Sequence, residues 1–226
     1  MPKTAPRVVP FSPFHGYRWR HGADRLPGTL MRLQPGQILV STGDPLAEVY
    51  SVERGELEVS LVTPNGQTKI IHVAGEGSTF GELQLFGGLA SCPVTVVARK
   101  PTLLRVTPFS TIQTAVARDP DLAANLMASM SRKALGFLRQ IEDLTFRSVR
   151  QRVACLLEAM FSVADEGNVS LEIAQETIAN LVGAHRVTVT ISLQELQDKG
   201  IVAVARGRLF LLNPEELRRE ALQTTK

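Results

Sequence analysis

The sequence has few of the residues from which disulfide frameworks, metal clusters and redox centres are built. Among its 226 residues only two are cysteines, Cys92 and Cys155. Two thiols are too few for a disulfide framework, a four-thiolate zinc site or a four-cysteine iron–sulfur cluster. We expect both to be reduced and unreactive, because no positively charged neighbour in sequence lowers the pKa of Cys92 as a redox sensor requires. The sequence predicts no cofactor and no bound metal.

Signals of catalysis and of membrane insertion are also missing. The four histidines are scattered, and the chain has no glycine-rich phosphate loop, no metal-spaced cluster and no nucleophile paired with a base. The longest uncharged apolar runs fall short of the roughly 20 residues that cross a bilayer, and residues 1–28 lack the apolar core of a signal peptide. We therefore predict a cytoplasmic protein that is not an enzyme and has no membrane contact.

Composition and charge allow an ordinary globular protein with two domains. The sequence is 44% hydrophobic and 21% charged, which suffices for one large core or two modest ones. The net charge is +3, but residues 1–28 hold five basic residues and one acidic residue, whereas residues 147–226 hold ten of each. Net charge is therefore weak evidence for nucleic-acid binding, which needs a local basic patch.

Residues 1–28 predict an irregular N-terminal arm. Aromatic residues such as Phe11, Phe14, Tyr17 and Trp19 occur there among prolines and glycines, without a helical or strand period. The arm is either a partly ordered tail or a lid whose aromatic side chains pack onto a neighbouring pocket or subunit.

Residues 29–109 have the pattern of an antiparallel β-domain. Short runs of alternating apolar and polar residues, such as 57–61 and 70–73, are separated by turn-forming pairs that contain glycine or proline. Five glycines are 12, 11, 11 and 4 residues apart, a spacing expected of a roll that turns at each of them. These glycines are Gly43, Gly55, Gly66, Gly77 and Gly81. We predict a β-roll.

Residues 110–146 change to a helical period. A short helix is predicted over 110–118, followed by a long helix from Asp119 through Phe146, which at about 1.5 Å per residue reaches roughly 40 Å. Apolar residues on the long helix are spaced by three and four, the pattern of a helix that packs along a partner helix. We predict the interface of a parallel homodimer; the alternative is packing on the chain's own β-roll. This dimer seam consists of Met127, Met130, Ala134, Phe137, Ile141 and Leu144.

Residues 147–226 predict a winged helix-turn-helix domain. An amphipathic helix over 148–163 is followed by a helix, a tight turn at Gly183 and a second helix whose Val189, Leu193 and Leu196 face the core. Residues 201–212, with an Arg-Gly pair at their centre, form a two-stranded wing. The fold class predicted for the whole chain is α+β, with an N-terminal β-roll, a long helix and a C-terminal winged helix-turn-helix.

Several motifs in a fixed order carry a resemblance to a known family. They are the glycine spacing, Phe80-Gly81-Glu82-Leu83, the long helix, Gln151-Arg152-Val153-Ala154, and the helix-turn-helix segments 178–183 and 185–189. Over about residues 29–212 the chain resembles the Crp/Fnr regulators, the family of the cyclic-AMP receptor protein. The resemblance implies an effector-binding, cyclic-nucleotide-binding-like β-roll over 29–109, a dimerisation helix within 110–146 and a DNA-binding domain over 147–226. It also implies a homodimer that binds a palindromic site on double-stranded DNA and regulates transcription.

The second helix of the helix-turn-helix is predicted to enter the major groove. Arg186 matches the first arginine of the family's recognition motif and can donate two hydrogen bonds to guanine; a phosphate contact is the alternative. The family's commonest pattern has glutamate where this chain has Val187 and a second arginine where it has Ile191, so we expect a different DNA sequence to be read. Here the chain resembles the global nitrogen regulators and the reductive-dehalogenation regulators.

Further residues are expected to contact DNA. The wing arginines, with Arg147, Arg150 and Arg152, neutralise phosphates unless they are ordinary solvated charges. His185 contacts a base or phosphate, or is only a surface residue at the helix start. The predicted DNA-binding residues are His185, Arg186, Val187, Thr188, Thr190, Arg206 and Arg208.

The predicted effector pocket departs from the family's cyclic-AMP site. In family members that bind cyclic AMP, the glutamate that Glu82 matches receives the ribose hydroxyl, and an arginine–serine pair holds the cyclic phosphate. Cys92 and Pro93 replace that pair here, and Phe137 and Leu138 replace a threonine–serine pair that contacts adenine. We therefore predict an effector other than cyclic AMP or none. The pocket is predicted to consist of His72, Gly81, Glu82, Leu83, Cys92, Pro93, Phe137 and Leu138.

The sequence does not select one class of effector. The alternatives are an apolar or aromatic ligand, an organic acid held by arm residues, and constitutive activity without a ligand. His72 is interpreted as a structural histidine, the alternatives being a ligand contact or a haem ligand. RNA polymerase is an expected partner if the protein is an activator. The rival interpretation of the chain is a cyclic-nucleotide-binding-like module whose winged helix docks a protein partner.

Overall fold

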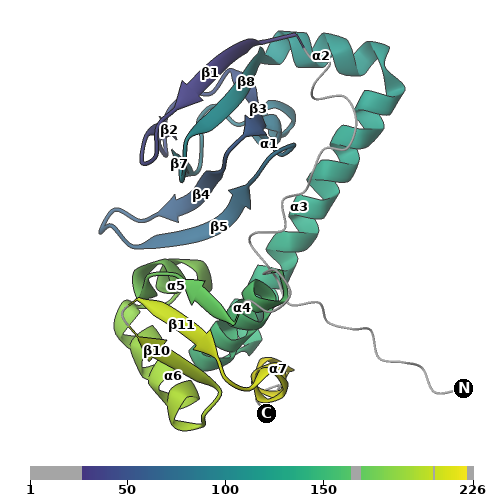
Figure 1. The fold of residues 1–226 in the computed structure, drawn as a ribbon. Coiled ribbons are helices and arrows are strands. Elements are labelled where there is room, and N and C mark those ends of the chain that lie inside the picture. The colour runs from purple at the N-terminus through teal and green to yellow at the C-terminus, as the bar shows by residue number, and fades with distance from the viewer. Residues whose placement is uncertain (1–26, 164–168, 206, 223–226) are drawn as a thin grey trace, which may run out of the picture. The chain divides into compact units, whose positions relative to one another are not determined.

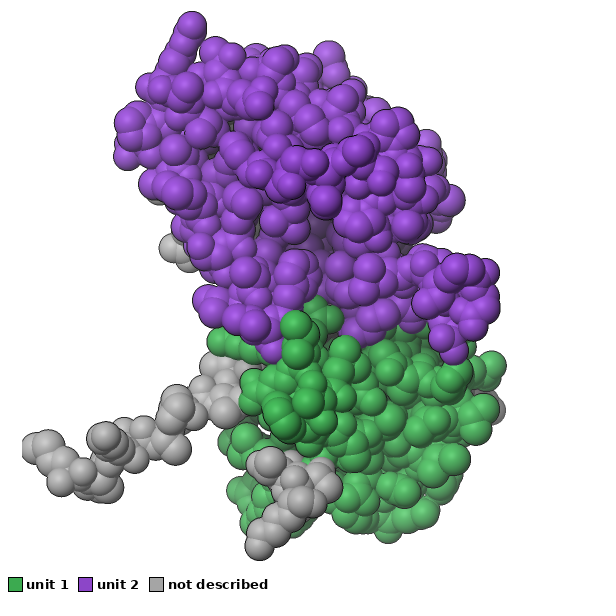
Figure 2. Space-filling model, turned by 180° about the vertical axis from the view of Figure 1, so that it is seen from behind, with its two compact units in different colours: residues 1–12, 139–226 green, residues 13–138 purple. Residues whose placement is uncertain are grey.

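The computed structural model describes residues 27–163, 169–205 and 207–222. These residues form two compact units: the first unit in chain order ends at Leu138 and is purple in Figure 2, and the second unit begins at Arg139 and is green. The boundary lies within helix α3 (Pro120–Phe146). The arm predicted for residues 1–28 falls almost entirely outside the described residues.

The first unit contains the predicted β-roll, built from two four-stranded antiparallel sheets (Figure 1). One sheet has the strand order β1 (Thr29–Leu33), β8 (Thr102–Pro108), β3 (Glu48–Arg54) and β6 (Thr79–Phe80). The other has the order β2 (Ile38–Val40), β7 (Thr95–Ala98), β4 (Leu57–Val62) and β5 (Thr68–Ala74). Apolar side chains from both sheets, among them Val52, Leu57, Val96 and Leu104, pack together in one core.

The turn before helix α1 (Glu82–Gly87) requires glycine. Gly81 has a φ of 104°, and a Cβ atom there would lie 2.4 Å from the carbonyl oxygen of Glu48. Only glycine adopts this backbone conformation without strain and leaves room for the neighbouring strand β3. The turn places Glu82 at the first position of α1, a short helix that the sequence pattern did not predict. The other four glycines of the predicted spacing also have positive φ.

Helix α2 (Phe109–Arg118) and helix α3 follow the β-roll with the predicted bounds to within one residue. Ile112 on α2 and Leu122 and Leu126 on α3 form a second apolar cluster with Val49. Further along α3 the buried positions continue in steps of three and four, which keeps them on one face of the helix. They are Leu122, Leu126, Ser129, Lys133, Gly136 and Gln140.

The second unit contains the predicted winged helix-turn-helix and two further elements. Helix α4 (Val149–Val163) precedes α5 (Gln175–Val182) and α6 (Arg186–Asp198), and the wing consists of β10 (Val202–Ala205) and β11 (Arg208–Leu211). Strand β9 (Ser170–Glu172), which was not predicted, pairs with β11. Helix α7 (Pro214–Leu222), also not predicted, packs against α4. The α+β fold class is confirmed. Across the described residues, no helix has both the length and the apolar character needed to span a membrane.

Helix α7 is held on α4 through Cys155 and Arg147. The Cys155 thiol donates a hydrogen bond of 3.2 Å to the carbonyl oxygen of Ala221, and the Arg147 guanidinium donates to the same oxygen. Arg147 Nε also lies 2.9 Å from Asp143 Oδ1. Burial raises the pKa of the Cys155 thiol to about 12, which agrees with the expectation of an unreactive cysteine.

Candidate DNA-binding surface and β-roll interior

The tight turn between α5 and α6 is built from Gly183 and Arg152. Gly183 ends α5 with a φ of 66°, in the left-handed region that glycine adopts without a steric penalty. The Arg152 guanidinium, on α4, donates to the carbonyl oxygens of Val182 at 2.6 Å and Gly183 at 3.3 Å. Carbonyl groups at this end of a helix lack partners within the helix. Arg152 therefore fixes the turn, and with it the start of α6.

Helix α6 has one buried face and one exposed face. Val189, Leu193 and Leu196 are buried in the second unit, as predicted from the sequence. The first two turns also present side chains to solvent, in a position from which a helix can enter the major groove. These exposed residues are Arg186, Val187, Thr188, Thr190 and Ile191, and His185 just before the helix is exposed as well.

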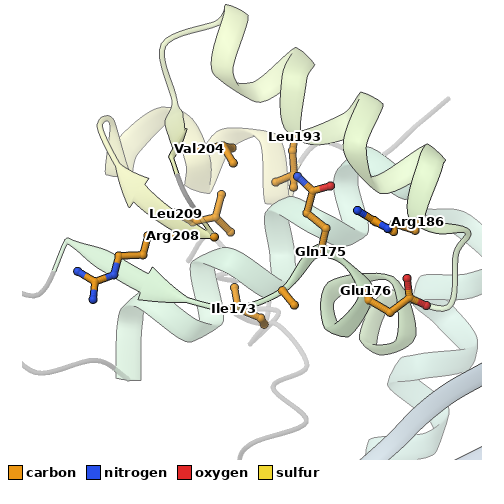
Figure 3. Close-up of a pocket in the computed structure, with 10 residues that line it drawn as sticks. Ile173, Gln175, Glu176, Arg186, Leu193, Val204, Arg208 and Leu209 are labelled. Carbon is orange, nitrogen blue, oxygen red and sulfur yellow. The ribbon is translucent and has the colours of Figure 1, made fainter.

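An open pocket of about 310 Å³ lies beside the start of α6, between the helix-turn-helix and the wing (Figure 3). Its lining includes Arg186, Gln175 and Arg208. In Figure 3 the Arg186 side chain points toward Gln175, and Arg208 lies on the other side of the pocket. The Thr190 hydroxyl is 2.7 Å from Gln175 Oε1 and 3.0 Å from the Arg186 carbonyl oxygen. Thr190 thus links the first residue of α5 to α6 as well as facing solvent.

The wing is tied to α6 by a hydrogen bond of 3.0 Å from the Val204 amide to Gln197 Oε1. Arg208, at the first position of β11, has its guanidinium 3.7 Å from the carboxylate of Glu172. Both side chains are more than half exposed, so the ion pair adds little to stability and leaves Arg208 accessible to a phosphate. Arg206 lies outside the described residues.

Three arginines that were expected to neutralise phosphates bind acceptors of the protein itself. Arg147 and Arg152 make the contacts with α7 and with the turn given above. Arg150 forms ion pairs with Glu195 on α6 at 3.4 Å and with Glu220 on α7 at 3.3 Å. These guanidinium groups join α4 to the rest of the second unit, and their contact with phosphates stays a prediction.

The β-roll interior brings Glu82 together with a residue that the sequence pattern did not single out. The ammonium group of Lys133, on α3, forms an ion pair with Glu82 Oε1 and donates a hydrogen bond of 2.7 Å to the carbonyl oxygen of Thr79. Glu82 is fully buried and Lys133 is 6% exposed. The carboxylate that matches the family's ribose contact is therefore already bound by a group of the same chain.

His72, on β5, is buried within electrostatic reach of Lys133. Burial, and next to it the positive charge of Lys133, lowers the pKa of the imidazole to about 3. The ring is therefore neutral at physiological pH. The structural role of His72 stays a prediction.

Cys92 stands at the position of the family's phosphate-binding arginine and belongs to the β-roll core. Its thiol donates to the Val94 carbonyl oxygen at 3.3 Å and lies 3.7 Å from Gln84 Nε2. Burial raises the pKa of the Cys92 thiol, so the group is neutral at pH 7 and offers no charge to a phosphate. In the part of the chain that the structure describes, no cluster of three or more histidine, cysteine or acidic side chains is arranged to hold a metal ion.

The other predicted pocket residues do not all converge on Glu82. Phe137 is half-buried, whereas Pro93 is exposed. Leu83 and Leu138 are 37% and 61% exposed. Since neighbouring positions of a helix point about 100° apart, Phe137 and Leu138 cannot both face the buried side of α3. The two positions that would contact adenine in cyclic-AMP binders are thus divided between two faces.

The predicted dimer seam lies mostly on the exposed side of α3. Met130 packs against the apolar cluster of its own chain, and Phe137 is half-buried. Leu135 and Leu138 extend the exposed apolar surface. An apolar surface along a long helix is the kind of surface that a partner helix covers. The exposed seam residues are Met127, Ala134, Ile141 and Leu144.

Lys133 and Thr79 are the site residues that sequence reasoning missed. A signal for Lys133 existed, because counting by three and four from Leu126 places Ser129 and Lys133 on the face that packs inward. A lysine on such a face needs an acidic partner. Nothing in the local sequence identified that partner as Glu82, which lies 51 positions earlier.

Comparisons with known proteins match both units. Residues 30–119 match the family described as cyclic nucleotide-binding domain, and residues 151–220 match the family described as Crp-like helix-turn-helix domain. The chain is 28% identical over 202 residues to the global nitrogen regulator of Synechococcus elongatus, covering 87% of this chain and 91% of that protein. It is 26% identical over 202 residues to a CRP-like cAMP-activated global transcriptional regulator of Mycobacterium tuberculosis, covering 84% and 89%.

The fold is also found among solved structures. A transcriptional regulator of the CRP/FNR family from Thermus thermophilus has a TM-score of 0.73 at 24% identity, covering 87% of this chain and 100% of that chain. A cyclic nucleotide-binding-like β-roll followed by a long helix and a Crp-like helix-turn-helix defines a class of DNA-binding transcription regulators. The chain belongs to the Crp/Fnr family. The members of this family are transcription regulators, not enzymes.

Proposed function

We propose that the protein binds a palindromic DNA site as a homodimer, with α6 in the major groove, and that cyclic AMP does not control it. The observation that carries this proposal is the exposed start of α6, where Arg186 and Val187 lie in solvent just after the turn that Arg152 fixes. Each base pair presents a distinct set of donors, acceptors and methyl groups in the major groove. An arginine and a valine at adjacent positions can read two different features of it.

The exposed apolar side of α3 supports the homodimer. A dimer presents two copies of α6, and two copies read two half-sites about one helical turn of DNA apart. The wing supplies Arg208 for phosphate contacts, with Arg206 as a further candidate. The matched relatives are bacterial regulators, and we propose a cytoplasmic location for this protein. An activator of this kind also contacts RNA polymerase.

Selection of bound sites from a random DNA library tests the proposal. We expect a palindrome whose half-sites are centred about 10–10.5 base pairs apart. Binding of the enriched site should weaken steeply between two salt concentrations, because phosphate contacts release counterions. Enrichment of a single half-site without its symmetric copy would contradict the dimeric arrangement. Absence of any enriched sequence would contradict sequence-specific binding through α6.

The independence from cyclic AMP rests on the β-roll interior. A cyclic phosphate would meet the neutral Cys92 thiol in place of an arginine, and Glu82 is already bound by Lys133. Burying a phosphate without a compensating charge is strongly unfavourable. Calorimetric titration of the purified protein with cyclic AMP should therefore show no binding at micromolar concentrations. Micromolar affinity would mean that an arginine from elsewhere in the protein supplies the missing charge.

A further inference from the structure

One buried ion pair joins helix α3 to the β-roll. Lys133 reaches from the inward face of α3 to Glu82, the first residue of α1, and to the carbonyl oxygen of Thr79 on β6. Two separate elements of the roll are thereby held by one ammonium group. Both charged side chains are almost completely shielded from solvent.

Burial makes this contact demanding in its geometry. A buried charge is tolerated only when an opposite charge and further hydrogen bonds compensate for lost hydration. Lys133 receives that compensation only where Glu82 and the Thr79 carbonyl oxygen lie next to each other. The Gly81 turn brings them together, because it sets the direction of α1. A displacement of α3 away from the roll would leave both charges uncompensated. The ion pair therefore favours one position of α3 on the β-roll.

A small-molecule effector that favoured the same position of α3 would have to contact the β-roll and α3 at the same time. Two of the groups that such a molecule would meet already have partners inside the protein: Glu82 Oε1 binds Lys133, and the Cys92 thiol binds the Val94 carbonyl oxygen. His72 is neutral and buried. None of these groups supplies an unpaired positive charge that could bind an anionic effector.

We infer that Lys133 substitutes for an effector: its ammonium group fixes α3 on the β-roll, so that the regulator binds DNA without a small molecule in the roll. The inference rests on the proposed function for its DNA-binding part. Its structural part, the fixing of α3, can be measured without DNA.

The test uses the full chain and a charge-neutral pair of substitutions. Lys133→Met alone would leave Glu82 buried without a partner and can prevent folding, so Lys133→Met is combined with Glu82→Gln. Circular dichroism checks that this double variant folds. Arg139→Met, an exposed position on the same helix, is the matched control. Hydrogen exchange over residues 126–138 reports on α3, and fluorescence anisotropy with the selected DNA reports on binding.

We expect the double variant to exchange its α3 amides at least about tenfold faster and to bind DNA at least about tenfold more weakly. The control should match the wild type in both measurements. Wild-type protein that has been unfolded, dialysed and refolded, and shown by native mass spectrometry to carry no small molecule, should bind DNA as tightly as protein that was never unfolded.

Two results would overturn the inference. One is a folded double variant with wild-type exchange and wild-type DNA affinity, because Lys133 then fixes nothing. The other is a folded, ligand-free wild type whose DNA affinity has dropped tenfold, because an effector is then required. If the native protein binds no DNA at all while the double variant still exchanges faster, the proposed function fails and the role of Lys133 in holding α3 is supported.

Discussion

The guanidinium group of Arg152 donates a hydrogen bond of 2.6 Å to the carbonyl oxygen of Val182. The two residues are 30 positions apart in the sequence, and their contact joins α4 to the turn that precedes α6. Arg152→Met keeps the length of the side chain and removes the donors. We expect the unfolding free energy to fall by about 1.5–3 kcal/mol, the range for a hydrogen bond to a charged group. Urea denaturation followed by circular dichroism measures it.

Arg218→Met is the control for that substitution. Arg218 also carries a guanidinium in the second unit, but its side chain is 67% exposed and its ion pair with Glu158 is 3.7 Å long. We expect its loss to change the unfolding free energy by less than about 0.5 kcal/mol. Equal effects of the two substitutions would mean that Arg152 does not stabilise the turn.

The homodimer prediction is tested most directly at Ile141. Its side chain is 59% exposed on α3, and in the proposed dimer a partner helix covers it. Ile141→Asp should dissociate the dimer, because it buries an unpaired carboxylate in an apolar contact. Light scattering gives the mass of the particle. Ala128→Asp adds the same charge at an exposed position outside the seam and should leave the mass unchanged. A dimeric Ile141→Asp protein would place the interface elsewhere.

His72 should make stability depend on pH in a defined direction. Its pKa of about 3 in the folded protein lies below the value of about 6.5 expected in the unfolded chain. As the pH falls below 6.5, the unfolded chain takes up a proton that the folded protein does not, so the unfolding free energy decreases. By pH 5 this loss reaches about 2 kcal/mol. His72→Gln should remove that part of the pH dependence.

Denaturation curves at pH 7 and pH 5 supply the comparison for His72. The wild type and His72→Gln are compared in the same buffers at both pH values. The absolute stability of His72→Gln is not the readout, since a buried amide has its own cost; the difference between the two pH values is. An unchanged difference in His72→Gln would show that this imidazole does not remain neutral.

Arg186 and Val187 should read different features of the half-site. Arg186→Ala should weaken binding by about 1–3 kcal/mol and relax the preference mainly at one guanine, since an arginine can donate two hydrogen bonds to that base. Val187→Glu introduces an acceptor that suits cytosine, so preference should move at the adjoining position. Site selection on wild type and both variants compares them. If all three proteins select the same palindrome, α6 does not lie in the major groove.

Local sequence patterns predicted most of the structure that depends on neighbours along the chain, although they missed the helices α1 and α7. The bounds of α3 and the left-handed turn at Gly183 follow from helical period and from the special freedom of glycine. The buried face of α6 likewise follows from the spacing of Val189, Leu193 and Leu196 by four and three residues. The resemblance to a known family added the order of the units, which period alone does not give.

The contacts that the patterns did not reveal connect distant parts of the chain. In the sequence, Lys133 cannot be distinguished from the other polar residues of its helix, and only the fold brings Glu82 next to it. Arg150 likewise reads as a free positive charge, but Glu220 on α7 binds it. Strand β9 has only three residues, too few for a periodic signal. Tertiary partners, which propensity and period do not encode, decided these cases.

The burial of both native thiols has a practical consequence for spectroscopy. Cys92 and Cys155 are the only cysteines of the chain, both are buried, and burial raises the pKa of each. The thiolate is the form that attacks maleimide and methanethiosulfonate spin-label reagents, so both native thiols should react slowly with them. A cysteine introduced at exposed Ala128 would then be labelled selectively in an otherwise unaltered sequence. In a dimer that one substitution yields two spin labels, and their separation reports on how the two copies of α3 are arranged.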